Sequence, residues 1–122
     1  LSIKRINDRS SATNGRLKKM IRFLKNVKAD SGQEINLSSF DFNAICYDID
    51  VKLYENLNKY LLVPIIYNQL YRLSVNETLA NNLKSVDEHE YIFKDNPEKY
   101  KSLRLLLEEI TAIYLDLKPQ LL

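Results

Sequence analysis

The feature of this 122-residue chain that most limits its fold is an apolar stripe at helical spacing in residues 16–30. Its members recur every three or four residues and are Leu17, Met20, Ile21, Leu24 and Val27. Side chains at this spacing share one face of an α-helix, whereas a half-buried strand would alternate apolar and polar residues. The chain has only two glycines and three prolines, so the residues that commonly form turns between strands are scarce. The sequence therefore predicts an all-α domain.

Similar patterns continue to the end of the chain and predict a compact bundle of five to six helices in a single domain, 1–122. The expected helices cover about 15–30, 39–50, 51–60, 64–73, 75–83 and 97–117. Several polar residues and prolines would cap, begin or end these helices: Asn14, Ser38 or Ser39, Ser74 with Glu77, Asn96, Pro97 and Pro119.

Composition limits where such a protein could act. No run of about 18 apolar residues could cross a membrane, and the first residues lack the apolar core of a signal peptide. The single cysteine, Cys46, excludes an internal disulfide and fits a reducing compartment, so we expect a cytoplasmic protein. The chain starts at Leu1 and its only methionine is Met20, which suggests a fragment of a longer protein.

Charge is distributed unevenly along the chain. Residues 1–30 hold nine Lys or Arg against two Asp, whereas residues 31–122 hold nine against fourteen acidic residues. Within the basic part, Lys18, Arg22 and Lys25 recur at helical spacing on a different face from the apolar stripe. Such a face can attract phosphate groups, although a merely solvated helix face explains the charge alone more simply.

No complete catalytic centre is visible in the residues. Asp48 and Asp50 are two apart, so on a helix they do not share a face. Neither glycine is followed by the serine of a nucleotidyltransferase metal site, so we expect both carboxylates to face solvent or to cap the next helix. The only histidine, His89, lies between two glutamates and is predicted at the surface, and Cys46 lies on an apolar stripe. The prediction is no catalytic residue and no metal ligand in this chain.

The paired serines suggest a different chemistry. Ser38 and Ser39 would open a helix, where free backbone N–H groups and the helix dipole favour an anion. If that helix packs beside the basic one, a cap hydroxyl, a helix end and long cations would form a phosphate site. The alternative is an N-capped helix beside a basic surface.

The stretch LKKMIRFLKNVKADSGQEINLSSFDFNAICYDI resembles the start of the helical C-terminal domain of template-independent nucleotidyltransferases. This family includes the oligoadenylate synthetases, cyclic GMP-AMP synthase and their bacterial cyclic-oligonucleotide relatives. The shared features are a basic helix, a polar loop of similar length, and a Ser-Ser-aromatic cap that opens an apolar helix.

The resemblance implies roles for individual residues. In the family, a lysine of the basic helix contacts the triphosphate of the donor nucleotide. Lys18 and Lys25 match positions of that kind, and Arg22 lies on the same face. The second serine of the cap, here Ser39, also contacts phosphate. The aromatic residue that follows lies against the base, and Phe40 keeps that surface without the hydroxyl of a tyrosine.

The resemblance also implies what this chain lacks. The catalytic carboxylates and the Gly-Ser turn of the family lie on an N-terminal lobe, where Mg²⁺ and the NTP would bind against this one. We therefore expect the helical C-terminal lobe of a template-independent nucleotidyltransferase, inactive alone. Its exposed apolar face would contact the missing lobe or form a homodimer. The alternative is a non-enzymatic helical module whose basic first helix binds nucleic acid or a partner protein.

Overall fold

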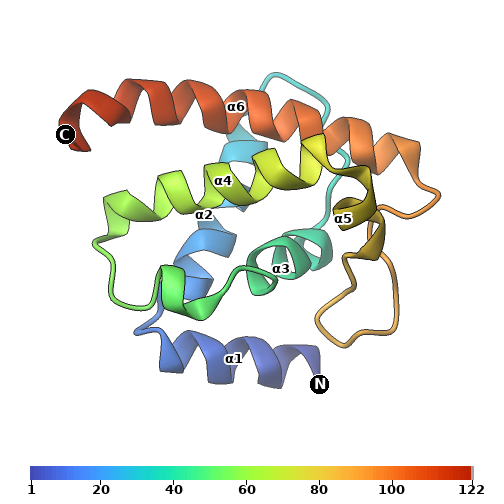
Figure 1. The fold of residues 1–122 in the computed structure, drawn as a ribbon, viewed down its shortest axis with the longest axis horizontal. Coiled ribbons are helices and arrows are strands. Elements are labelled where there is room, and N and C mark those ends of the chain that lie inside the picture. The colour runs from blue at the N-terminus through green and yellow to red at the C-terminus, as the bar shows by residue number, and fades with distance from the viewer. Residues whose placement is uncertain (122) are drawn as a thin grey trace.

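Helices and the turns between them make up the described part of the chain. The computed structural model describes residues 1–121, and within them six α-helices and two short 3-10 helices form one bundle (Figure 1). They follow one another as α1 (Ser2–Ala12), α2 (Arg16–Asp30), α3 (Ser39–Tyr47), η1 (Val51–Leu53), η2 (Lys59–Leu61), α4 (Leu62–Val75), α5 (Glu77–Asn82) and α6 (Pro97–Leu121). The only strand-like feature in this range is a single bridge between Lys84 and Tyr91. The predicted all-α fold is confirmed.

Two long helices, α4 and α6, run antiparallel along one side of the bundle, and α2 crosses behind them (Figure 1). α3 packs against α2, and α1 lies along the edge opposite α6. The core between these helices is mainly aliphatic, and its fully buried members include Leu17, Met20, Leu24, Ile45, Ile66, Leu70, Leu103 and Leu106. All five residues of the predicted α2 stripe are buried. Their burial turns the basic face of α2 outward.

The first helix, α1, is not predicted by the sequence pattern, because it buries only one apolar side chain, that of Ile6. Arginines hold this helix in place instead. The Arg9 guanidinium lies 3.5 Å from the centre of the Tyr47 ring and donates a hydrogen bond to the Tyr47 carbonyl oxygen at 2.5 Å. Arg5 donates to the Val86 carbonyl oxygen at 2.7 Å. Polar anchors of this kind leave no periodic apolar signal.

The turn between α1 and α2 uses left-handed backbone conformations. Asn14 has a φ of 55° and Gly15 a φ of 81°. The N-cap position of α2 belongs to Gly15, so the prediction that Asn14 caps this helix is wrong. Glycine suits the position because a residue without a Cβ adopts positive φ without strain.

The predicted helix over residues 51–60 is also wrong. Two single 3-10 turns stand in its place. Each turn begins after a polar residue, Asp50 or Asn58, whose side chain accepts the backbone N–H two residues on. Between the turns, the Leu57 carbonyl oxygen accepts a hydrogen bond from the Arg16 side chain at 2.6 Å. Caps and this tertiary bond therefore replace a continuous helical ladder.

The ends of the later helices follow the predictions only in part. Asn96 caps the start of α6 as predicted. α5 is capped by Asn76 and not by Ser74, whose hydroxyl instead donates to the backbone of α4. α6 continues through Pro119 to Leu121, so the prediction that this proline ends the helix is wrong. A proline in the last turn removes only one helical hydrogen bond, and that turn is largely exposed.

A capping box fixes the start of α3. The Ser38 hydroxyl accepts the Asp41 N–H at 3.3 Å, and the Asp41 carboxylate accepts the Ser38 N–H at 2.9 Å. Asp41 is buried and also binds the Lys99 ammonium of α6 at 2.9 Å. Ser39 is the first residue of the helix, and its hydroxyl has no hydrogen-bond partner within residues 1–121. Of the two serines, Ser38 is therefore the cap.

Ser38→Ala and Ser39→Ala should differ in stability. Loss of an N-cap hydroxyl costs about 1 kcal/mol, so Ser38→Ala should lower the free energy of unfolding by that amount in urea denaturation. Ser39→Ala is the matched control. It removes an exposed hydroxyl and should change the free energy by less than about 0.5 kcal/mol. Equal losses in the two variants would contradict the assignment of the cap.

Tyr54 is the largest fully buried side chain, and its hydroxyl is the one fully buried side-chain polar atom among residues 1–121 without a hydrogen-bond partner. Burial raises the pKa of this phenol to about 12, because the phenolate would lose its hydration there. An unpaired buried donor costs free energy. The ring therefore stabilises the fold through packing and not through its hydroxyl.

Tyr54→Phe should leave the protein at least as stable at neutral pH, because the ring stays and the unpaired hydroxyl goes. A free tyrosine ionises near pH 10, whereas Tyr54 in the folded protein ionises only at about 12. Because the folded state holds the phenolic proton more tightly than the unfolded chain does, the free energy of unfolding is unaffected by this group below about pH 10. It falls as the pH rises from about 10 toward 12, where the unfolded chain ionises first. Urea denaturation across this range should show a smaller loss for Tyr54→Phe than for the wild type.

Tyr71→Phe provides the control for this experiment, because Tyr71 is 49% exposed. This variant should lose stability at high pH as the wild type does. If Tyr54→Phe is as sensitive to high pH as the control, the burial argument is wrong.

Candidate functional site

The nine cations of residues 1–30 divide into two groups in the structure. Five have side-chain hydrogen bonds within the fold, four of them to other segments of the chain and that of Lys4 to Asp8 of the same helix: Lys4, Arg5, Arg9, Arg16 and Lys28. Lys28, for example, donates to the Leu37 carbonyl oxygen at 2.6 Å and so ties the end of α2 to the start of α3. The other four have no side-chain hydrogen bond or ion pair among the described residues: Lys18, Lys19, Arg22 and Lys25. All four lie on α2.

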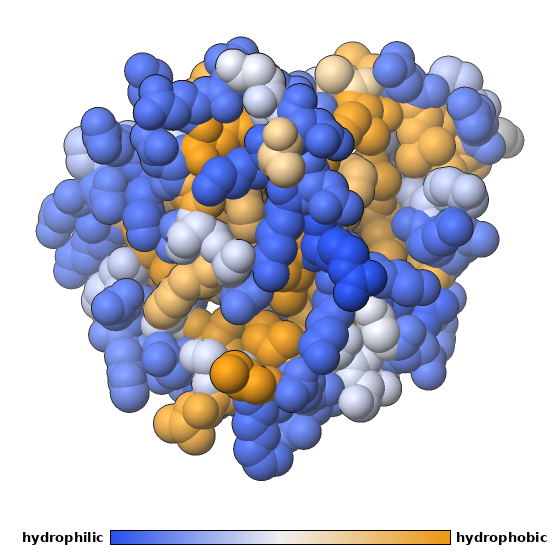
Figure 2. Space-filling view, turned by 180° about the vertical axis from the view of Figure 1, so that it is seen from behind, coloured by the Kyte–Doolittle hydropathy of each residue, from blue (hydrophilic) through white to orange (hydrophobic). Residues whose placement is uncertain are grey.

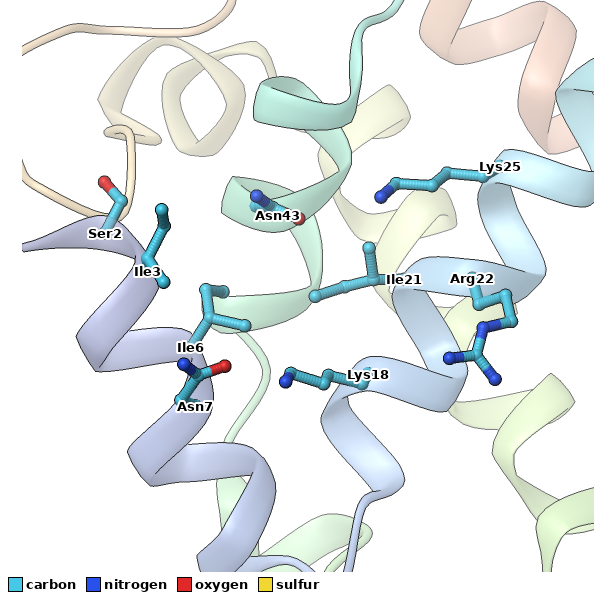
Figure 3. A pocket seen from close by; sticks show the side chains of 9 residues that line it. All are labelled: Ser2, Ile3, Ile6, Asn7, Lys18, Ile21, Arg22, Lys25 and Asn43. Atoms are coloured by element: carbon cyan, nitrogen blue, oxygen red, sulfur yellow. The ribbon is translucent and has the colours of Figure 1, made fainter.

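Three of these four cations, Lys18, Arg22 and Lys25, line one cavity of about 330 Å³ between α1, α2 and α3, called the α2 pocket below (Figure 3). Its other lining residues are apolar or uncharged: Ser2, Ile3, Ile6, Asn7, Ile21 and Asn43. No carboxylate of the described residues lines this cavity. The structure thus brings three predicted site residues together without local compensation of their charge.

The side chains of the α2 pocket have distinct orientations. Lys18 and Lys25 extend from α2 toward Asn7 of α1 and Asn43 of α3 respectively, whereas Arg22 stays beside α2 (Figure 3). The two lysines are seven residues apart, which is about 10 Å along a helix. Seen from behind, hydrophobic side chains are exposed in the lower part of the surface, where α1 passes, and also in its upper part, and hydrophilic ones border both (Figure 2). The α2 pocket thus combines the buried apolar side chains of Ile6 and Ile21 with its three exposed cations.

Ser39 and Phe40, the other two predicted site residues, lie at the start of α3. Phe40 is 37% exposed and lines a separate cavity of about 180 Å³ together with Ser2, Asn43 and Val86. Ser39 is exposed and lines neither cavity. The two cavities share Ser2 and Asn43, which the sequence analysis does not single out because no motif marks them.

The acidic pair has structural partners. Asp48 accepts hydrogen bonds from Arg72 and Gln69, each at 2.9 Å. Asp50 accepts the Lys52 N–H at 3.0 Å and so caps η1, as predicted. Within residues 1–121, no group of three or more His, Cys, Asp or Glu side chains is arranged to hold a metal ion. These carboxylates therefore serve the fold.

The remaining candidates behave as ordinary structural residues. The His89 side chain is 75% exposed, which confirms its predicted surface position. Cys46 is fully buried, and burial raises the pKa of its thiol, so it is a core residue. None of the helices in residues 1–121 has both the length and the apolar composition to cross a membrane.

Comparison with known proteins identifies the class of domain. The family model described as the cGAS/DncV-like nucleotidyltransferase C-terminal helical domain matches residues 4–115, and the chain belongs to this family. The predicted resemblance to the C-terminal helical domain of template-independent nucleotidyltransferases is thereby confirmed.

Individual relatives give the same result. The chain is 60% identical over 110 residues to a c-di-GMP synthase of Capnocytophaga granulosa, which covers 89% of this chain and 31% of that protein. It is 49% identical over 117 residues to a c-di-GMP synthase of a Lachnospiraceae bacterium, which covers 96% of this chain and 34% of that protein. The chain thus spans about a third of the length of these curated relatives.

A solved structure shows the same arrangement of helices. The STING-associated CdnE c-di-GMP synthase from Capnocytophaga granulosa matches with a TM-score of 0.95 and 60% sequence identity. The match covers 98% of this chain and 39% of that chain. The fold described above is therefore that of the family's C-terminal helical domain, which in this relative is part of a longer chain.

Arg9→Ala should loosen α1, one wall of the α2 pocket, because it removes both the hydrogen bond to the Tyr47 carbonyl and the contact with the Tyr47 ring. A hydrogen bond from a charged donor contributes about 1.5–3 kcal/mol, so α1 amides should exchange about tenfold faster or more in native-state hydrogen exchange. The control is Lys4→Ala, which breaks an exposed pair with Asp8 and should have little effect. Unchanged exchange in Arg9→Ala would contradict the anchoring role.

Proposed function

We propose that this chain is the C-terminal lobe of a template-independent nucleotidyltransferase and that its α2 pocket holds the triphosphate of an NTP. The observation that carries the proposal is the composition of that pocket. Lys18, Arg22 and Lys25 line it, and no carboxylate of the described residues does. Like charges held near one another repel, and a ligand with several negative charges would remove that repulsion.

The two lysines are best placed for this role. Lys18 and Lys25 extend across the pocket from positions about 10 Å apart along α2, so flexible ammonium groups could bind different phosphates of one polyphosphate. Arg22 lies beside them at the rim, where its planar guanidinium offers a bidentate contact to phosphate. The lobe would thus position the triphosphate and stabilise its charge, and would not carry out the chemical step itself.

The start of α3 would extend the site. Ser38 serves as the cap, so the Ser39 hydroxyl is left to bind a phosphate oxygen. The Phe40 ring is 37% exposed and lies beyond Asn43, in the neighbouring cavity. There it could stack on the base, although phenylalanine cannot add the hydrogen bond of a tyrosine.

The rest of the active site would lie on an N-terminal lobe of the same protein. The carboxylates of Asp48 and Asp50 have partners within the fold, so we place the Mg²⁺ ligands and the catalytic carboxylates on that lobe. Bound Mg²⁺ would neutralise part of the polyphosphate charge. Since the relatives are c-di-GMP synthases, GTP is the nucleotide to test first.

Exposed apolar residues support a contact with a further lobe. Leu1 and Ile3 are 77% and 78% exposed at the start of α1, and Ile3 borders the α2 pocket. We propose that they pack against the N-terminal lobe. In the isolated chain they would be free to pair with a second copy, and sedimentation would detect such a homodimer.

Lys18→Ala and Lys25→Ala in the full-length protein should each lower kcat/KM for GTP about tenfold or more, because each removes a charge-assisted hydrogen bond to phosphate. Lys19→Ala is the matched control. It removes the adjacent cation of α2, which does not line the pocket, and should change kcat/KM less than about twofold. The isolated chain should be inactive.

Unchanged GTP kinetics in Lys18→Ala, Lys25→Ala and Ser39→Ala would contradict the proposed site. Binding of duplex nucleic acid that falls steeply with salt, and that mononucleotides do not compete for, would instead support the non-enzymatic module.

A further inference from the structure

We propose that Asn43 recognises the sugar of the bound nucleotide through a hydrogen bond between its carboxamide and a ribose hydroxyl. The inference rests on the proposed function and assigns a specificity-determining residue to the same site. No residue type or motif in the sequence marks this position.

The position of Asn43 provides the first argument. It lines the α2 pocket opposite Lys25, and it also lines the neighbouring cavity that holds Phe40. In a nucleotide the sugar lies between the phosphates and the base. If the triphosphate lies against the α2 cations and the base against Phe40, the sugar passes Asn43. Asn7 also faces the pocket, but from α1 beside Lys18, and it does not line the Phe40 cavity. Ser2 lines both cavities from the start of α1, but its single hydroxyl offers fewer hydrogen bonds than the carboxamide of Asn43.

The unused hydrogen-bonding capacity of Asn43 provides the second argument. Its carboxamide has no hydrogen bond among the described residues, whereas three other asparagines, Asn58, Asn76 and Asn96, cap helices with theirs. A half-buried carboxamide at the pocket surface offers two donors and an acceptor. A ribose hydroxyl both donates and accepts, so the two groups match.

The location within α3 provides the third argument. Asparagine is a poorer helix former than alanine, and Asn43 lies in the middle of a nine-residue helix where it caps nothing. Its neighbours Phe42 and Ala44 are each 1% exposed, so packing fixes the backbone of Asn43. A residue that adds little to helix stability, on a rigid support, suits a ligand contact.

The test compares GTP with its 2′-deoxy and 3′-deoxy analogues as substrates of the full-length protein. The wild type should prefer GTP over one analogue by about tenfold, because a site that binds a hydroxyl discriminates against its loss. Asn43→Ala should lower kcat/KM about tenfold for GTP and leave it unchanged for that analogue, so the preference should disappear. Because alanine favours the helix, this variant should fold, and its melting temperature checks this.

Two controls separate this inference from the proposed function. Asn7→Ala should keep the wild-type preference. Lys18→Ala should lower kcat/KM for GTP and for the analogue by the same factor, so this variant should also keep the wild-type preference. If Lys18→Ala weakens both substrates while Asn43→Ala keeps the preference, the assignment of the sugar contact is overturned and the triphosphate site stands. If neither Lys18→Ala nor Lys25→Ala changes the kinetics with GTP, the proposed function itself fails. A wild type that accepts both analogues as well as GTP would also overturn the inference.

Discussion

Burial of the α2 apolar stripe is the interaction on which the rest of the structure depends. Leu17, Met20 and Leu24 are fully buried, and because an α-helix has a fixed periodicity, their burial sets which residues of α2 point outward. The pocket cations are thereby directed away from the core. Lys28 then binds the carbonyl oxygen before the α3 cap, which fixes α3 beside this basic face. The geometry of the candidate site thus follows from packing that involves none of its charged groups.

The pattern of success in the sequence predictions has a physical explanation. Apolar periodicity correctly places α2, α3, α4 and α6, because these helices bury apolar side chains. It misses α1, which is held by arginines, and it extends a helix through residues 51–60, where polar caps break the backbone ladder. Both failures occur where polar contacts decide the structure: long-range ones for α1, and local caps with one long-range bond from Arg16 for residues 51–60. Such contacts leave no periodic apolar signal in the sequence.

The candidate site was predictable to a similar extent. Helical spacing groups Lys18, Arg22 and Lys25, and the structure brings them together around one pocket. Sequence could not separate them from Lys28 or Arg16, which bind backbone carbonyl oxygens. Only the fold distinguishes cations that hold the domain together from those that stay available. Because the available cations are accessible to water, salt should weaken their attraction for a phosphate ligand.

The most direct test of the central claim is a structure of the full-length protein with a non-hydrolysable GTP analogue. Our account predicts triphosphate oxygens within hydrogen-bond distance of the Lys18 and Lys25 ammonium groups and the Ser39 hydroxyl. A triphosphate bound elsewhere, with both lysines directed into solvent, would contradict it.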